Sequence, residues 1–349
     1  MEIVRPRHLR PGDTVAVLSP SWGGPAVFPH VFDKGLAVLR EDFGLRVREF
    51  PTARRAPAAL QADPRARAAD LNAAFADPEV VAIIVSVGGE DSVRLLPYLD
   101  PAIIKQNPKI LMGYSDTTTL LTFVNQLGIV TFNGPAVMAG FAQLHALPEA
   151  FAAHLRVLLF SAPATYTYEP YGAYIEHHLD WNDPRNAGLV EPFRPDPDGM
   201  RWLQGKGPVT GRLFGGCIEV LEFLKGTRFW PAPDFWEGRI LFFETSEDVP
   251  PPASVGYFLR NYGMQGIFDR AAGVVFGRAR GYTPAQKREL EARAVAIIAG
   301  EFGRGDMPIV ANADFGHTDP QWVIPLGVRA ELDPRGPSLR LIEPACAPA

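Results

Sequence analysis

The sequence contains few cysteines, no long apolar segment and no excess of basic residues. Its 349 residues include two cysteines, Cys217 and Cys346, without a CxxC pair, so neither a disulfide framework nor a thiolate zinc cluster is expected. The longest strongly apolar run, Val80 to Val87, is far too short to span a bilayer, and the N-terminus lacks the apolar core of a signal peptide. A formal net charge of -5 offers no general attraction to nucleic acid or anionic lipid. A cytoplasmic enzyme fits these absences best.

The histidines do not form a metal-binding pattern either. Seven are present, and none lies in an HExxH motif. His177 and His178 are adjacent, with Glu176 and Asp180 nearby, but adjacent residues of a helix face different directions. We therefore expect neither a metal ion nor a cofactor.

Three apolar runs in the first 140 residues have the composition of strands buried on both faces. They are Thr14 to Ser19, Val80 to Val87 and Lys109 to Ser115. Helical patterns separate them, and one that follows the third run closes at Gly128. The order βαβαβα predicts a doubly wound, mostly parallel α/β domain over residues 1–162, with ligands at the carboxyl ends of its strands.

The composition changes near residue 163. Residues 163–206 are rich in Pro, Asp, Asn and aromatic residues and show little periodicity, which is typical of a functional loop or an interdomain connection. Strands and helices resume near residue 207. We therefore predict a linker and substrate loop over 163–206 and a second, mixed α/β domain over 207–349.

The stretch LMGYSDTT places Ser115 between an apolar strand and a helical pattern. Hydrolase nucleophiles occupy such strand–turn–helix corners. There the next backbone N–H, that of Asp116, could stabilise an oxyanion at the start of the helix. The G-x-S-x-G signature is incomplete, because Gly113 is present but Thr117 replaces the last glycine. Serine is also a common N-cap, and this segment read alone favours the cap.

Paired glycines, Gly88 and Gly89, follow the second apolar run in SVGGEDS. Glycines at a strand end let backbone amides approach a ligand, which suits an oxyanion hole or a phosphate. The sequence has no G-x-G-x-x-G motif and no Walker lysine, so an ordinary phosphate loop is excluded. A plain tight turn is the alternative.

Glu244 and His317 each follow an apolar segment. A carboxylate at a strand end can orient a histidine, although Glu244 could instead belong to a solvated acidic loop with Glu247 and Asp248. Ser115, Glu244 and His317 occur in the order nucleophile, acid, histidine, which recurs among serine hydrolases. Taken together, these segments favour a catalytic role for Ser115.

The chain resembles the LD-carboxypeptidase family of serine peptidases, which includes the microcin C self-immunity peptidases. The resemblance covers nearly the whole chain and rests on separated motifs in the correct order: LRPGDTVAVLSPS, SVGGEDSVRLLPYLD, LMGYSDTTTLL, TFNGPAVM, GRLFGGCIEVL, LFFETSED and FGHTDPQWVIPLG. It implies a triad of Ser115, Glu244 and His317. It also implies an oxyanion hole from the amides of Asp116 and the Gly88–Gly89 turn, often a homodimer, and no metal.

Within the family, SVGGEDSVRLLPYLD, GGCIEVL and FFETSED are most similar to the microcin-immunity branch. Members that cleave acidic aminoacyl substrates carry Asn after the glycine pair that this chain has in GGCIEVL, and Lys four residues after the triad Glu. This chain has Cys217 and Asp248 at those positions. Because Asp248 would repel an acidic side chain, we do not expect aspartyl or glutamyl substrates. Trp181 could stack on a base or pack within the protein.

The sequence therefore predicts a serine hydrolase that cleaves an amide-type bond next to an amino acid. The preferred substrate class is a peptidyl or aminoacyl nucleotide analogue. One alternative is an LD-carboxypeptidase that removes the terminal D-amino acid from a murein tetrapeptide (a muramoyltetrapeptide carboxypeptidase). Another is a small-molecule binding protein without catalysis. The sequence does not decide among them.

Overall fold

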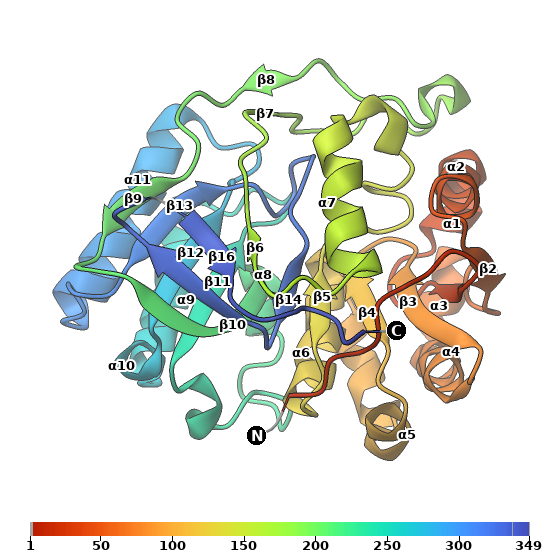
Figure 1. Ribbon diagram of the computed structural model, residues 1–349, viewed down its shortest axis with the longest axis horizontal. Helices are drawn as coiled ribbons and strands as arrows, with labels where there is room; N and C mark the ends of the chain where they lie inside the picture. Colours follow the sequence, from red (N-terminus) through yellow and green to blue (C-terminus); the bar gives the residue numbers. More distant parts are fainter. Residues whose placement is uncertain (1–2, 337, 349) are drawn as a thin grey trace.

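The computed structural model describes residues 3–336 and 338–348 and arranges them around two large sheets (Figure 1). The terminal residues 1, 2 and 349 of the expected domains lie outside the described part. Figure 1 shows helices α1 to α4 at one side of the molecule and α9 to α11 at the other, with most strands of both sheets between them. The expected α/β fold in two domains is confirmed. No described helix is long and apolar enough to cross a membrane.

The six-stranded sheet has the order β14-β5-β4-β3-β1-β2. Its strands are β1 (Thr14–Leu18), β2 (Arg46–Glu49), β3 (Val80–Val85), β4 (Ile110–Gly113), β5 (Thr131–Asn133) and β14 (Ile324–Leu326). The strands from β2 to β5 pair in parallel, and β14 pairs with β5 antiparallel. The strand order reverses beside β1, and in such sheets the ligand crevice lies outside the carboxyl ends of the strands at that point.

Helices cover this sheet, and several of them begin at a proline, whose fixed φ suits the first helical position. The α-helices are α1 (Gly24–Val27), α2 (Pro29–Glu41), α3 (Pro57–Ala62), α4 (Pro64–Ala76), α5 (Pro101–Gln106), α6 (Thr118–Gln126) and α7 (Glu149–Phe160). The short 3₁₀ helices are η1 (Ser92–Tyr98), η2 (Ser115–Thr117) and η3 (Leu144–Ala146). Helix α6 is buried around most of its circumference because it contacts both β5 and β10.

The eight-stranded sheet has the order β6-β16-β15-β10-β11-β12-β13-β9. Its strands are β6 (Tyr166–Thr167), β9 (Arg201–Gln204), β10 (Val209–Cys217), β11 (Arg239–Glu244), β12 (Gly273–Gly277), β13 (Ile309–Ala313), β15 (Arg329–Asp333) and β16 (Ser338–Leu341). Strands β10 to β13 pair in parallel, and the flanking strands pair antiparallel. The associated helices are α8 (Ile218–Glu222), η5 (Pro233–Trp236), α9 (Pro252–Met264), α10 (Ile267–Arg270), α11 (Pro284–Val295) and the π-helical η6 (Ala296–Glu301).

The connection and the C-terminal half supply short strands that the sequence did not predict. The expected connection, 163–206, supplies β6 and β9 to the second sheet, and it also forms β7 (Ala173–Tyr174), η4 (Pro184–Asn186) and β8 (Arg194–Pro195). Strand β14 comes from the C-terminal part of the chain but completes the first sheet. Buried apolar side chains of both halves form one continuous cluster. This shared apolar cluster and strand β14 therefore hold the two halves together.

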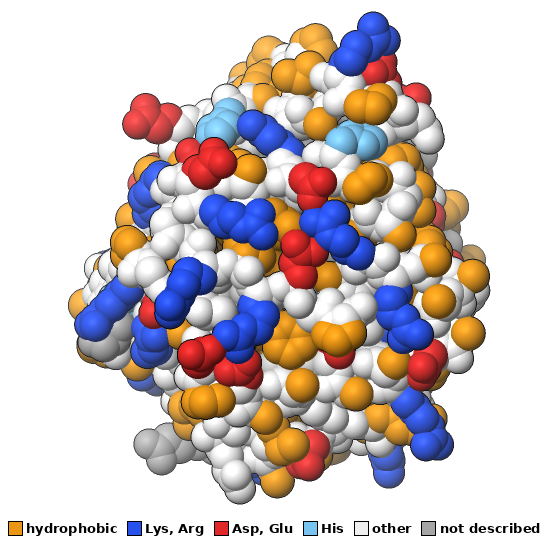
Figure 2. All heavy atoms as spheres, turned by 90° about the vertical axis from the view of Figure 1, so that its right-hand side faces the viewer, with side chains coloured by type: hydrophobic (Ala, Val, Ile, Leu, Met, Phe, Trp, Pro, Cys, Tyr) orange, Lys and Arg blue, Asp and Glu red, His pale blue; other side chains and the backbone are white. Residues whose placement is uncertain are grey.

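The face formed by the N-terminal helices carries both signs of charge. Figure 2 shows basic and acidic side chains interspersed there. Ion pairs account for much of this mixing: Arg54 contacts Asp33 at 2.6 Å, and Arg48 pairs with Asp77 and Glu79. This visible face therefore offers no continuous basic surface for a polyanion.

The core of the first sheet provides a stability test. Leu111 in β4 is fully buried, whereas Leu189 is 52% exposed. We expect Leu111→Ala to lower the free energy of unfolding by about 2–5 kcal/mol, because it leaves a cavity in the core. Leu189→Ala should change it by no more than about 0.5 kcal/mol. Urea unfolding followed by circular dichroism measures both, and equal losses would contradict the assigned core.

Candidate active site

Ser115 occupies a strained turn between β4 and α6. Tyr114 is extended, whereas Ser115 has a φ of +58°, in the left-handed region that costs a non-glycine residue of order 1–3 kcal/mol. The chain then enters η2 and α6 directly. This strained strand–turn–helix corner is the geometry that presents the nucleophile of α/β hydrolases.

Gly113 makes this corner possible. A Cβ at Gly113 would lie 2.6 Å from Val85 Cγ2 and 2.9 Å from the Thr117 side chain. The glycine two residues before the serine is therefore required by close packing. Thr117, which stands where the motif has its last glycine, is buried against it, so the incomplete signature still builds the turn.

Ser115, His317 and Glu244 form one hydrogen-bonded series. The Ser115 Oγ lies 3.0 Å from His317 Nε2, and His317 Nδ1 makes a short contact with Glu244 Oε2. Glu244 ends β11, and His317 lies in the loop that follows β13. The side chains of His317 and Glu244 are 4% and 0% exposed. The carboxyl ends of strands in both sheets thus bring together the three residues that the sequence singled out.

Charge and burial act in opposite directions on this series. Burial lowers the pKa of His317, but the carboxylates of Glu244 and Glu247 outweigh it and raise that pKa to about 10. Burial raises the pKa of Glu244, partly offset by the charge of His317. Because Nδ1 faces a carboxylate, the proton on that nitrogen is donated to Glu244, and Nε2 is the nitrogen that faces Ser115.

Glu247 is a third contact of His317 that the sequence did not single out. Its Oε2 lies 3.0 Å from His317 Nε2, and its side chain is 54% exposed. Hydrogen bonding to His317 lowers the pKa of Glu247 to about 2. The sequence placed Glu247 in an acidic loop, and nothing in its spacing shows that the loop turns back onto the histidine.

The Gly88–Gly89 turn lies against Ser115. A Cβ at Gly88 would be 3.0 Å from Ser115 Cβ and 3.7 Å from the backbone nitrogen of Asp116. A Cβ at Gly89 would collide with Ser21 Oγ, 2.2 Å away. Both positions therefore require glycine for close approach, and Gly88 is the one beside the serine. Donation from these amides to an oxyanion stays a prediction.

The side chain of Asp116 holds this turn against the serine. Its Oδ2 accepts the backbone N–H of Ser92 at 2.9 Å and a short hydrogen bond from the Ser21 hydroxyl. The Ser92 hydroxyl in turn donates to the Asp116 carbonyl at 2.6 Å. Burial raises the pKa of Asp116, and these hydrogen bonds partly oppose it. One buried carboxylate thus connects the loops that follow β1, β3 and β4.

A cavity of about 720 Å³ opens over Ser115 and His317. Its charged lining residues are Glu90, Asp91, Glu247, Asp248 and Arg280. Arg280 is the only lysine or arginine among the described lining residues. Acidic residues thus outnumber lysine and arginine on the described cavity lining, which favours a ligand that carries a positive group.

The cavity also has an aromatic wall. Trp22 and Trp181 line it, and Phe28 lies between them with ring centroids 6.0 Å from Trp22 and 5.7 Å from Trp181. His178 also lines the cavity, with its ring 5.1 Å from that of Trp181. These rings offer apolar faces to a planar group.

The three candidate substrate-binding residues differ in position. Trp181 and Asp248 line the cavity. Cys217 is fully buried and is not among the described lining residues, so its thiol is not placed to contact a ligand there. The thiol contacts Glu219 at 3.6 Å, and the backbone N–H of Cys217 donates to Thr118 Oγ1 at 3.1 Å. Through this backbone hydrogen bond, Cys217 helps to hold the start of α6 in place.

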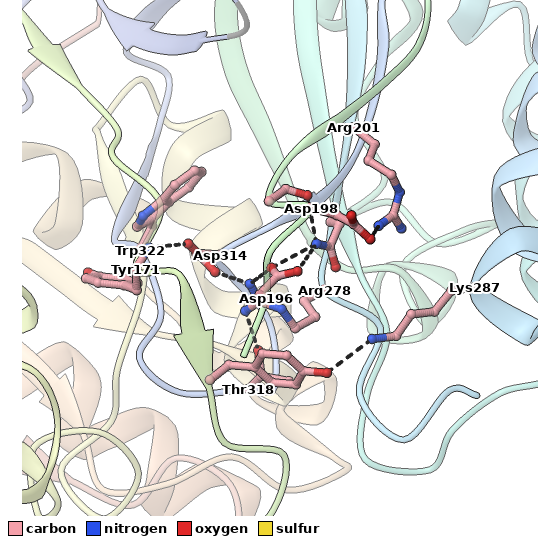
Figure 3. A network of polar contacts seen from close by, with 12 residues as sticks. Tyr171, Asp196, Asp198, Arg201, Arg278, Lys287, Asp314, Thr318 and Trp322 are labelled. Carbon is pink, nitrogen blue, oxygen red and sulfur yellow. Dashed lines mark hydrogen bonds and ion pairs between the residues drawn. The ribbon is translucent and has the colours of Figure 1, made fainter. Parts of the chain in front are cut away.

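The connection between the halves is fastened to the loop that carries His317. Ile175 and Asp319 exchange backbone hydrogen bonds of 2.8 and 3.2 Å, which brings His178 and Trp181 over the cavity. Next to this bridge, Figure 3 shows Arg278 between Asp196 of the connection and Asp314 of the histidine loop. Because Arg278 is 1% exposed, this buried charge network fixes both segments to the end of β12.

The described residues contain no set of side chains arranged as metal ligands. No group of three or more His, Cys, Asp or Glu side chains within 3–336 and 338–348 is placed to hold a metal ion. His177 Nδ1 contacts Arg280 at 3.2 Å, whereas His178 faces the cavity. The adjacent histidines thus have different surroundings.

A serine on a strained strand–helix turn, an imidazole and a buried carboxylate in series are the parts of a serine-hydrolase site. The family model of the LD-carboxypeptidase N-terminal domain matches residues 15–134, and that of the C-terminal domain matches residues 210–332. The chain belongs to the LD-carboxypeptidase family of peptidases (S66), as its motifs indicated.

Two curated relatives represent different activities. Microcin C7 self-immunity protein MccF of Escherichia coli is 27% identical over 269 residues, which cover 76% of this chain and 75% of MccF. A Bacillus subtilis protein named "Probable murein peptide carboxypeptidase" is 27% identical, over 94% of this chain and 91% of the relative. Similar identity to both means that overall likeness does not choose between them.

Solved structures share the fold over nearly the full length. An MccF-like protein from Streptococcus pneumoniae in complex with AMP has a TM-score of 0.83 at 27% identity, covering 95% of this chain and 98% of that chain. MccF in complex with aspartyl sulfamoyl adenosine has a TM-score of 0.85 at 24% identity, covering 99% and 100%. The second likeness concerns the fold alone.

The close approach of Gly88 to Ser115 gives a prediction for reactivity. Gly88→Ala would force a methyl group 3.0 Å from Ser115 Cβ and 3.2 Å from Oγ. We expect fluorophosphonate labelling of Ser115 to slow by about 100-fold, because small displacements of reacting groups are costly. Gly207→Ala, where nothing lies within 4 Å of the new Cβ, should label at the normal rate. Intact-mass time courses measure both, and equal rates would contradict this geometry.

Proposed function

We propose that this protein is a serine hydrolase that cleaves an amide-type bond next to an amino acid. Ser115 is the nucleophile, His317 the general base and Glu244 the carboxylate that orients the imidazole. The observation that carries the proposal is the hydrogen-bonded series of these three side chains, of which Ser115 and His317 line the cavity. Membership of a peptidase family supports the same reaction class.

The reaction would proceed through an acyl-enzyme. Neutral His317 takes the Ser115 proton through Nε2 as Oγ attacks the carbonyl carbon, and Glu244 stabilises the imidazolium that forms. The amides of Asp116 and the Gly88–Gly89 turn receive the oxyanion, where losing one donor typically costs about 10²–10³ in kcat. His317 then protonates the leaving group, and a water molecule deacylates Ser115 by the same route.

The cavity supports an aminoacyl or peptidyl nucleotide analogue as the substrate. Its volume lies within the range of small-molecule sites, roughly 300–1,000 Å³, and Trp22 and Trp181 offer ring faces to a base. Structural relatives bind AMP and an aminoacyl sulfamoyl nucleoside. Because Asp248 and Glu247 line the cavity, the aminoacyl side chain is neutral or basic rather than acidic.

One observation favours a murein tetrapeptide as the second candidate substrate. Arg280 lines the same cavity as Ser115, and a guanidinium is suited to binding the terminal carboxylate that an LD-carboxypeptidase must recognise. The name of the Bacillus subtilis relative points the same way. Location in the cytoplasm, predicted from the sequence, and assembly as a homodimer, implied by the family resemblance, both stay predictions.

A substrate panel tests the proposal. The protein is incubated with alanyl, lysyl and aspartyl sulfamoyl adenosine and with a murein tetrapeptide, and products are identified by mass spectrometry. We expect release of alanine and lysine, with the aspartyl compound at least about tenfold slower because of repulsion by nearby carboxylates. Cleavage of the tetrapeptide alone would favour the second candidate. Binding without any product would favour a non-catalytic protein.

Two variants that each remove one serine hydroxyl identify the nucleophile. Ser115→Ala should abolish turnover and fluorophosphonate labelling while its circular dichroism spectrum stays unchanged. Ser161→Ala removes a hydroxyl that bonds only to the Val157 carbonyl among the described contacts and should behave as the parent protein does. Full activity of Ser115→Ala would contradict the mechanism.

A further inference from the structure

The carboxylate of Glu247 shares the histidine nitrogen that the mechanism requires. Glu247 Oε2 and Ser115 Oγ each lie 3.0 Å from His317 Nε2. An imidazole nitrogen presents either one N–H or one lone pair in the plane of the ring. The protonation state of His317 therefore decides which of these two contacts is favourable.

The contact with Glu247 is favourable only for a protonated histidine. Nδ1 carries a proton toward Glu244, as its short contact indicates. A neutral ring would then direct the Nε2 lone pair at the lone pairs of the Glu247 carboxylate, which is repulsive. With carboxylates at both nitrogens, the ring is an imidazolium in this arrangement. An imidazolium cannot accept the proton of Ser115, so this arrangement is a resting state of the site.

The two carboxylates are held very differently. The Glu244 side chain is 0% exposed, and Gly316 of the histidine loop packs against it. The Glu247 side chain is 54% exposed and lies on the cavity wall. An exposed ion pair contributes little net stability because water solvates the separated charges. Glu247 can therefore leave the histidine at a lower cost than Glu244 can.

A substrate with a free α-amino group offers Glu247 another cation. In an aminoacyl compound the α-ammonium is two bonds from the carbonyl carbon that Ser115 attacks, so it must lie beside Ser115 and His317. The other described acidic residues that line the cavity are Glu90, Asp91 and Asp248, and Asp91 is already paired with Arg67 and Arg94. Glu247 is thus the carboxylate that both contacts the catalytic histidine and faces the cavity.

We propose that Glu247 keeps His317 protonated until the α-ammonium of the substrate replaces the imidazolium as its partner. His317 then releases its proton to solvent and becomes the base that accepts the Ser115 proton. This inference rests on the proposed function and narrows its substrate class to aminoacyl compounds with a free α-amino group. Compounds acylated at that nitrogen, including a murein peptide at its scissile residue, lack the required cation.

Several groups besides Glu247 face His317 and shape its titration. Glu244 approaches from β11, and the Tyr114 ring from the end of β4, with ring centroids 4.9 Å apart. The charges of His178, from the connection, and Asp319, from the histidine's own loop, act with that of His317 on one another. Arg280, after β12, acts on the same groups. Only Glu247 is expected to change partner on binding.

Two pH profiles test the proposal on the sulfamoyl adenosine from the panel with the highest kcat/KM. The profile of kcat/KM reports the free enzyme and that of kcat reports the complex. Because a raised pKa delays formation of the neutral base, the acid limb of kcat/KM should lie at least about one pH unit above that of kcat. Glu247→Gln should bring the limbs together, whereas Glu90→Gln, which removes a charge from the same cavity, should leave them apart. Coincident limbs in the parent protein would overturn the proposal.

The substrate class is tested with the Nα-acetyl form of the same compound. The parent protein should hydrolyse it at least about tenfold less efficiently in kcat/KM, which corresponds to the loss of one charge-assisted contact. Glu247→Gln should lose that preference, and Glu90→Gln should keep it. Equal efficiency on both compounds in the parent protein, or an unchanged preference in Glu247→Gln, would overturn the proposal.

A measurement without substrate separates this inference from the proposed function. In the free protein, the NMR titration of the His317 ring should show a pKa lowered by at least about one unit in Glu247→Gln. An unchanged titration would overturn the inference even if the panel is hydrolysed. Failure to hydrolyse either the sulfamoyl adenosines or the tetrapeptide would instead overturn the proposed function, and the titration alone would then decide whether Glu247 controls the histidine.

Discussion

The pair between His317 and Glu244 is the interaction on which the site depends. Both side chains are almost fully buried, and buried charges are tolerated only when they are paired. Glu244 ends a central strand, and His317 is carried by the loop that follows β13. Because Ser115 lies at the end of a strand of the other sheet, the pair also defines where the two sheets must meet.

Several surrounding features keep that meeting point fixed. Asp116 fastens the glycine turn to the serine corner, and Arg278 fastens the connection to the loop that carries His317. Strand β14, which follows that loop, returns to pair with β5 and thereby joins the halves. A site built from two sheets needs such hydrogen bonds, ion pairs and strand pairing, because catalytic groups misplaced by about 1 Å lose much of their effect.

The sequence alone predicted the strands and site residues that their own composition or motif marks. The runs that became β1, β3 and β4 are almost wholly buried, so their composition reflects the sheet directly, and the motif order placed Ser115, Glu244 and His317. Strands such as β6 and β14 have two or three residues. These strands are too short to show an alternation of apolar and polar residues. They are recognised as strands only by their pairing with neighbouring strands. The contact of Glu247 with His317 likewise depends on how an exposed loop folds back.

The central claim is that the buried carboxylate Glu244 activates Ser115 through His317. The rate at which a fluorophosphonate acylates Ser115, followed by intact mass and peptide mapping in the parent protein and in Glu244→Gln, tests this most directly. We predict a single adduct on Ser115 and a rate lowered by about 10³–10⁴-fold in the variant, as expected when a triad carboxylate is neutralised. An unchanged rate, or an adduct on another residue, would contradict the account.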